Sequence, residues 1–203
     1  MKKLYALLLA TTSLVYSCQN EKPFDENVDR QTYISDKGNC DSMSVNFTNK
    51  LAAEYYCKST EYLEKNDFKN ALKWALSAEK SEPNNIMLLK DISLIYSQLN
   101  QISVAKLYLK KVFEIDSTYG LGWHQLSGIY LLEENYSEAL VASNRAISTN
   151  RLYGPYYVHK VFAHYFLNQK DSACHYLKTL IAVDQHESYN MFKSNFRAME
   201  CFE

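Results

Sequence analysis

Hydrophobic and small residues recur along this chain with a period of 34 residues. Alanine occupies the same place in four successive segments, at Ala71, Ala105, Ala139 and Ala173. A column of large side chains keeps the same register, at Tyr62, Tyr96, Tyr130 and His164. Residues 52–187 hold four such segments without an insertion, since four times 34 is 136 residues. The pattern predicts four similar units in tandem.

Within each unit the apolar spacing is typical of paired amphipathic helices. Bulky or small residues follow one another at steps of three and four over two stretches of about 13 residues. In the first unit these residues are Tyr55, Ser59 and Tyr62, then Ala71, Trp74, Ala75 and Ala78. Polar pairs typical of tight turns separate the two stretches in every unit, at Asn66-Asp67, Asn100-Gln101, Glu134-Asn135 and Asn168-Gln169. Each unit therefore predicts a helix-turn-helix.

This period, with its aromatic, small, tyrosine and alanine positions in that order, resembles the tetratricopeptide repeat (TPR). The resemblance implies an all-α fold, a right-handed superhelical solenoid of four TPR helix-turn-helix repeats. The repeats span 52–85, 86–119, 120–153 and 154–187, within a domain of residues 44–187. Lys58 and Lys160 depart from the pattern, because Ile92 and Leu126 are apolar in the same column. Terminal repeats tolerate such changes, since one side of each faces solvent.

Residues 188–203 predict a further helix that caps the last repeat. Their apolar residues have amphipathic spacing, at Met191, Phe192, Phe196, Met199 and Phe202. A docking surface for a partner is the alternative interpretation of the same stripe.

The first 17 residues predict an export signal. Lys2 and Lys3 precede an apolar run from Leu4 to Tyr16 of about 13 residues, which is too short to cross a bilayer. The run ends at Val15-Tyr16-Ser17-Cys18, which resembles the lipobox of bacterial lipoproteins, although Tyr16 departs from the small or branched residue usual there. The resemblance implies that Cys18 is lipidated and becomes the new N-terminus. An ordinary cleaved signal is the alternative.

The residue after the lipidated cysteine bears on the location of the mature protein. In many Gram-negative lipoproteins an aspartate at this place retains the protein at the inner membrane, whereas this chain has Gln19. We therefore expect an exported protein that is lipid-anchored to the cell envelope, at the outer membrane of a Gram-negative bacterium. The following residues, within 18–43, are polar and acidic and predict a flexible tether. A peptide that docks a partner is the other interpretation of this stretch.

The TPR resemblance also implies where a partner binds, because the first helix of each repeat lines a groove in that family. The residues selected on this face are Tyr56, Lys90, Leu94, His124, Leu131, Phe162, Tyr165 and Phe166. Leu131 and the three aromatic residues of the last repeat are the expected anchors. The alternative is that some of them contact the capping helix. The Lys, Asn and Arg clamp with which some TPR cochaperones bind a C-terminal carboxylate is absent.

The sequence contains no motif that predicts catalysis, a cofactor or a metal. His159 and His164 are five residues apart, which does not place them on one helical face as a four-residue step would. Neither a G-x-S-x-G motif nor a phosphate-binding glycine loop occurs. A net charge of −1 gives no general reason to bind nucleic acid. We expect a scaffold without enzymatic activity; an accessory subunit of an envelope secretion, motility or wall-assembly complex is one alternative. A small helical hydrolase or metal protein is the other.

Four cysteines remain when Cys18 is set aside, and export would place them in an oxidising compartment. Cys40 lies shortly before the first helix, which carries Cys57, and Cys174 lies on the second helix of the last repeat. Cys201 is near the end of the capping helix. We expect the pairs Cys40–Cys57 and Cys174–Cys201, one at each end of the solenoid. Four reduced, buried thiols are the alternative.

Overall fold

The computed structural model describes residues 46–183, together with residues 199 and 201. All regular structure in these ranges is helical. The helices are α3 (Lys50–Glu64), α4 (Phe68–Ser81), α5 (Ile86–Gln98), α6 (Ile102–Ile115), α7 (Gly120–Leu132), α8 (Tyr136–Thr149), α9 (Pro155–Phe166) and α10 (Lys170–Val183). None of the helices described is both long and apolar enough to cross a bilayer. The predicted capping helix and the residues before 46 lie outside the described ranges.

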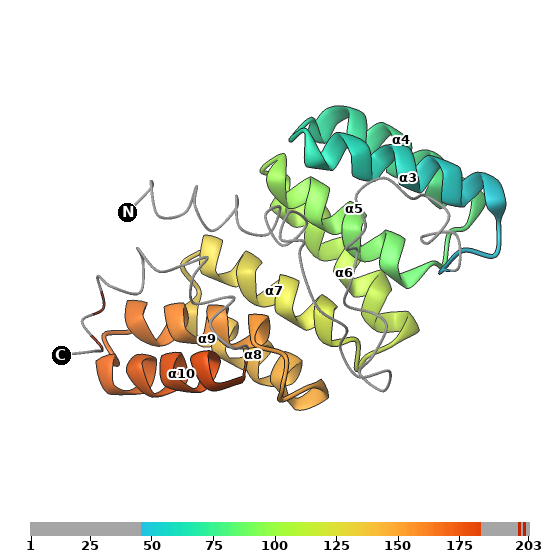
Figure 1. Ribbon diagram of the computed structural model, residues 1–203. Helices are drawn as coiled ribbons and strands as arrows, with labels where there is room; N and C mark the ends of the chain where they lie inside the picture. The colour runs from blue at the N-terminus through green and yellow to red at the C-terminus, as the bar shows by residue number, and fades with distance from the viewer. Residues whose placement is uncertain (1–45, 184–198, 200, 202–203) are drawn as a thin grey trace. The chain divides into compact units, whose positions relative to one another are not determined.

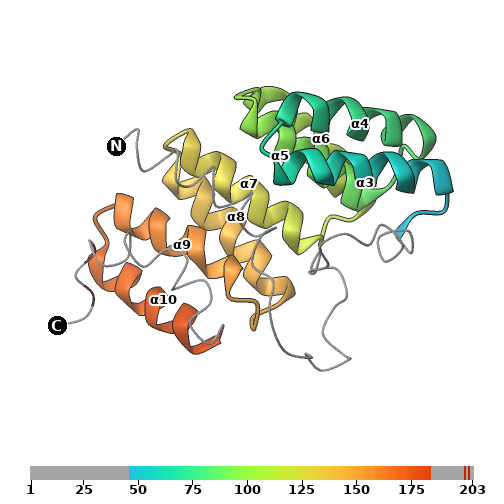
Figure 2. The same ribbon diagram turned by 45° about the horizontal axis from the view of Figure 1, so that its top comes forward.

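Each predicted repeat contains two of these helices, the first of 12 to 15 residues and the second of 14. Consecutive helices such as α3 and α4, or α9 and α10, lie side by side (Figures 1 and 2). The chain divides into two compact units. Unit 1, up to Tyr108, contains α3, α4, α5 and the first part of α6. Unit 2, from Leu109, contains the remainder of α6 and α7 to α10.

The alanine column is buried in every repeat. Its four members are fully buried, each with 0% of its surface exposed: Ala71, Ala105, Ala139 and Ala173. In the first two repeats a serine hydroxyl of the first helix donates to the alanine carbonyl, from Ser59 Oγ at 2.9 Å and from Ser93 Oγ at 2.8 Å. Small side chains in both columns allow this direct contact between a side chain and the opposite backbone.

A buried apolar cluster forms around these contacts in unit 1. It consists of Tyr56, Leu63, Ala71, Ala75, Ala78, Leu88, Ile92 and Ile95. In unit 2 the fully or almost fully buried apolar side chains include Leu109, Val112, Ile129, Leu131, Val161, Phe162, Leu177 and Leu180. The predicted column positions therefore supply much of the interior of each unit.

Polar side chains begin several of the helices. Asn49, Asp67, Asn85 and Asn135 each accept a hydrogen bond from a backbone N–H of the first helical turn. α9 begins differently, with Pro155 in its first turn. The N–H groups of the first turn have no partner within a helix, so the N–H that proline lacks costs no helical hydrogen bond. Pro83 and Asn84-Asn85 mark the start of the second repeat in the sequence, and Asn85 caps α5 there.

The turn between the two helices of each repeat contains one residue in the left-handed conformation. These residues are 34 apart: Asn66 (φ 55°), Asn100 (φ 61°), Glu134 (φ 60°) and Asn168 (φ 58°). The next residue donates its N–H back to the first helix, for example from Asp67 to the Tyr62 carbonyl at 2.9 Å. This is the hydrogen bond of a Schellman turn, in which glycine or asparagine is favoured. Glu134 is the exception, because its longer side chain is disfavoured at this φ.

A disulfide joins Cys174 of α10 to Cys201, the pairing that the cysteine positions predict, with the two Cα atoms 5.1 Å apart. Cys57 is also disulfide-bonded. Its expected partner, Cys40, lies outside the described ranges. The bond from Cys174 fixes residue 201 to the last repeat, where Met199 is also buried.

Glu134→Asn should stabilise the protein by about 0.5–1 kcal/mol, because asparagine tolerates the left-handed conformation better than glutamate. Glu134 is exposed, so the change removes little packing. A shift of the urea midpoint on a circular dichroism unfolding curve measures the effect. The reverse substitution at the equivalent turn, Asn100→Glu, should lower the midpoint by a similar amount. Equal midpoints for the native protein and both variants would contradict the left-handed conformation assigned to these turn residues.

Candidate partner-binding face

The predicted binding residues lie on the first helices of the repeats, which are α3 and α5 in unit 1 and α7 and α9 in unit 2. In each unit a side chain of one first helix makes a specific contact with a side chain of the next first helix. The two contacts differ in chemistry, since one involves a buried charge and the other a pair of stacked imidazoles.

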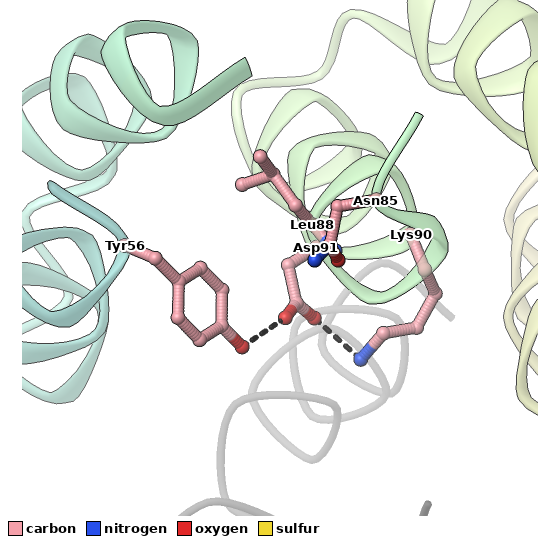
Figure 3. A network of polar contacts seen from close by, with 5 residues as sticks. All are labelled: Tyr56, Asn85, Leu88, Lys90 and Asp91. Atoms are coloured by element: carbon pink, nitrogen blue, oxygen red, sulfur yellow. Dashed lines mark hydrogen bonds and ion pairs between the residues drawn. The ribbon is translucent and has the colours of Figure 1, made fainter. Parts of the chain in front are cut away.

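In unit 1 the contact is centred on the carboxylate of Asp91, which is 1% exposed (Figure 3). Tyr56 Oη of α3 donates to Asp91 Oδ2 at 2.6 Å. The Lys90 ammonium forms an ion pair with Asp91 Oδ1 from the same helix. A buried carboxylate is costly unless it is paired and hydrogen-bonded, and here each oxygen has a partner. The network therefore fixes where α5 lies against α3.

The start of α5 places Asp91 in this position. Asn85 Oδ1 accepts from the Leu88 N–H at 3.1 Å, and Asn85 Nδ2 donates to the Asn46 carbonyl at 2.7 Å and to Glu82 Oε1 at 3.0 Å. Leu88 lies about one turn before Asp91 on α5, and Asn85 caps the start of the same helix (Figure 3). Phe47 packs against the ring of Tyr56 with the centroids 5.0 Å apart. Both participants of the Tyr56–Asp91 hydrogen bond are thus held by their own surroundings.

In unit 2 the equivalent contact joins His124 of α7 to His159 of α9. The two imidazole rings stack with their centroids 4.3 Å apart and an interplanar angle of 7°. Gly128 leaves room for this arrangement, because a Cβ there would lie 2.9 Å from His159 Cε1. His159 is 3% exposed, so its ring is part of the packed interface between the two helices.

The hydrogen bonds around His159 determine its tautomer. Its Nδ1 lies 3.1 Å from the His124 carbonyl, which can only accept, so Nδ1 carries the proton. Ser127 donates its hydroxyl to the same carbonyl at 2.6 Å, and its oxygen lies 2.7 Å from His159 Nδ1 as a second acceptor. Ser127 continues the small column of Ser59 and Ser93, but its hydroxyl is directed to this network. Ser127 has no exposed surface, and its hydroxyl bonds the His124 carbonyl, so its role is structural.

Burial lowers the pKa of His159 from its ordinary value of 6.5 to about 4, although the hydrogen bond to the His124 carbonyl acts in the opposite direction. Transfer of a charged imidazolium into this interface is unfavourable, because the groups that contact its Nδ1, the Ser127 hydroxyl and the His124 carbonyl, carry no negative charge. The ring is therefore neutral at neutral pH.

The two contacts use the same register, which sequence reasoning missed. Tyr56 and Asp91 are 35 residues apart, as are His124 and His159. Tyr56 and His124 were selected as groove residues, whereas Asp91 and His159 occupy the neighbouring column. Both pairs can be found in the sequence by their separation of 35 residues, which is the 34-residue period plus one.

At the end of α9 the structure brings three predicted aromatic anchors together. Phe166 lies 6.4 Å from Phe162 and 5.7 Å from Tyr165, measured between ring centroids. Phe166 also stacks on Tyr136, at the start of α8, at 5.1 Å. Tyr165 and Phe166 remain partly exposed, while Phe162 is 1% exposed.

The predicted groove residues fall into two classes by exposure. Lys90, His124, Tyr165 and Phe166 are partly exposed. Tyr56, Leu94, Leu131 and Phe162 are buried. The buried members support the face from beneath, so the residues that present surface are the partly exposed ones. Cys18 lies outside the described ranges, and within those ranges no group of three or more His, Cys, Asp or Glu side chains is placed to hold a metal ion.

A family profile described as Tetratricopeptide repeat matches residues 91–119. Among solved structures, a crystal structure of MamA protein has a TM-score of 0.58 at 20% identity, covering 75% of this chain and 88% of that one. MamA from Desulfovibrio magneticus RS-1 has a TM-score of 0.60 at 15% identity, covering 76% and 91%. Pseudomonas aeruginosa PilF has a TM-score of 0.63 at 12% identity, covering 75% and 72%. None of the curated proteins matches the sequence. The similarity confirms the predicted all-α solenoid of helix-turn-helix repeats.

The stability of the protein should decrease as the pH falls from 6.5 towards 4, with a contribution of about 3 kcal/mol from His159. Between these values the unfolded chain binds a proton at this position and the folded chain does not, whereas above pH 6.5 both states are neutral. Urea unfolding at pH 7.5 and 4.5 measures the effect. His159→Gln should reduce the difference between the two pH values, and His175→Gln, at an exposed position, should not. Parallel pH profiles for the native protein and His159→Gln would contradict the low pKa.

Proposed function

This chain is a member of the tetratricopeptide-repeat family, and we propose that it is a lipid-anchored adaptor of the bacterial cell envelope. In this proposal the first-helix face binds a protein or peptide, and the chain performs no chemistry of its own. Cys18 carries the lipid, and the residues up to 43 connect it to the folded repeats. The partner belongs to an envelope assembly at the outer membrane.

The pair of half-buried aromatic rings at the end of α9 carries the binding proposal. Tyr165 and Phe166 present apolar surface at the end of a first helix, and Phe166 is supported from behind by Tyr136 and Phe162. Aromatic side chains that are already ordered lose little conformational entropy on binding, which makes them effective anchors. Within the same unit His124 adds polar surface on α7, with its position set by the stacked ring of His159. In unit 1, considered by itself, Lys90 adds polar surface on α5 beside Asp91.

The anchoring proposal is supported by the sequence before the fold. A charged start, a short apolar run and a cysteine directly after Val15-Tyr16-Ser17 have the order of a lipoprotein signal. A triacylated cysteine would hold the protein stably at a membrane, whereas a single chain gives only marginal binding. The mature chain has 20 basic and 23 acidic residues once two signal lysines are removed, so charge alone would not hold it on anionic lipid.

Replacement of both half-buried rings, Tyr165→Ala with Phe166→Ala, should abolish capture of an envelope protein in a crosslinking pull-down from membranes. The loss follows from removal of two anchors, each typically worth at least 1–2 kcal/mol in an interface. Leu152→Ala is the matched control, because Leu152 is an apolar side chain with 76% exposure outside the helices. Capture should persist in this control. Unchanged capture by a correctly folded double variant would overturn the binding face.

Lipidation of Cys18 is tested separately with the variant Cys18→Ser, expressed in cells beside the native protein. The native protein should incorporate labelled palmitate and sediment with membranes, and the variant should do neither. Incorporation of the label into Cys18→Ser would contradict lipidation at this cysteine, without affecting the result for the aromatic pair.

A further inference from the structure

Lys160 of α9 is a lysine in a position that the repeat normally fills with an apolar side chain. The same column holds Ile92 and Leu126 in the two middle repeats. Lys160 is 9% exposed, so most of its side chain is removed from water. Lysine is rarely buried to this extent unless its charge is compensated.

The compensation visible in the described part of the chain is incomplete. Lys160 Nζ lies 3.7 Å from the ring centroid of Tyr176 on α10, which is a cation–π contact. Within residues 46–183, 199 and 201, the ammonium forms no ion pair or hydrogen bond with any side chain. An ammonium has three N–H donors, and an aromatic face satisfies at most one of them. No carboxylate of the described residues pairs with the remaining donors. Lys160 Nζ is not a fully buried atom, so these donors are open to solvent or to a ligand.

The first repeat contains an equivalent lysine, Lys58, whose exposure to water differs from that of Lys160. Lys58 Nζ lies 4.4 Å from the ring of Trp74, and these two residues occupy the columns of Lys160 and Tyr176. Lys58 is exposed, so water hydrates its ammonium. The lysine beside the ring is thus exposed in the first repeat, whereas in the last repeat most of its side chain is buried and only the ammonium end is accessible.

The ring of Tyr176, the aromatic wall beside Lys160, is held in a fixed orientation by its neighbours. Tyr176 stacks on His164 with centroids 5.2 Å apart and an interplanar angle of 13°, and His175 meets its edge at 5.0 Å. His164 Nδ1 in turn lies 2.6 Å from Gln169 Oε1 and donates to it. An ordered cation above an ordered ring suits a ligand that combines one negative charge with a short apolar stem.

We propose that Lys160 and Tyr176 form a binding site for the carboxylate of a glutamate or aspartate in a protein partner. The ammonium pairs with the carboxylate, and the methylene groups of the acidic side chain lie against the aromatic wall. A single ammonium matches a single negative charge, whereas phosphate dianions are usually bound by arginine clusters or several N–H donors. The inference rests on the proposed role in protein binding and specifies an acidic segment as the ligand.

Fluorescence anisotropy of the full chain with a labelled peptide of glutamate and alanine tests the site. The native protein should bind this peptide, and should bind the corresponding glutamine peptide much more weakly. Lys160→Met should weaken binding of the glutamate peptide by about tenfold, through loss of a charge-assisted contact. Lys58→Met, the equivalent change in the first repeat, should alter the affinity by less than about twofold, because surface charges contribute little.

Other occupants give different outcomes, each of which overturns the proposal. Tighter binding of a phosphoserine peptide than of the glutamate peptide would assign the site to phosphate. A lower urea midpoint of Lys160→Met with unchanged peptide affinity would show that the chain itself supplies the counter-ion. Lys160→Gln provides a second variant if the methionine form does not fold. The Tyr165→Ala with Phe166→Ala variant should still bind the glutamate peptide, so failure of this site and failure of the first-helix face are distinguishable.

Discussion

The close approach of the two helices within each repeat is the constraint on which the structure depends. It requires a fully buried small side chain at the crossing point, which alanine supplies in all four repeats. It also requires a short turn, which a left-handed residue at the same place in every repeat provides. A larger residue at Ala71 or Ala139 would force the helices apart, because packed interiors accommodate added volume poorly. Within each repeat, the position of the first helix against the second follows from this arrangement.

The first helices are then joined to one another by polar contacts of a defined register. In unit 1 a buried carboxylate accepts a hydrogen bond from a tyrosine hydroxyl and pairs with a lysine. In unit 2 the imidazoles of His124 and His159 stack, and Ser127 Oγ lies against His159 Nδ1. Removal of one participant leaves the other buried without its partner, so each contact strongly favours one alignment of the two helices. An adaptor surface composed of several helices needs this kind of alignment, because its binding residues come from different repeats.

The sequence predicts the repeat boundaries, the turns and the alanine column because these depend on local spacing. It does not predict which face residues remain exposed. Leu131 and Phe162 were expected to be anchors, yet both are buried, since exposure depends on neighbouring helices as well as on position along one helix. Asp91 and His159 were missed for a related reason: each lies one position beyond the selected column and meets a residue from the preceding repeat. Lys160 was interpreted as a tolerated substitution at an end, but its burial differs from that of Lys58.

A double-mutant cycle between Tyr56 and Asp91 tests most directly whether polar contacts hold the first helices in register. The free energy of unfolding is measured for the native protein, Tyr56→Phe, Asp91→Ala and the double variant. We expect a coupling energy of about 1–3 kcal/mol, because a charged, buried hydrogen bond is lost in either single variant. A coupling energy near zero, with both single variants folded, would show that apolar packing alone sets the register and would contradict the central role of this contact.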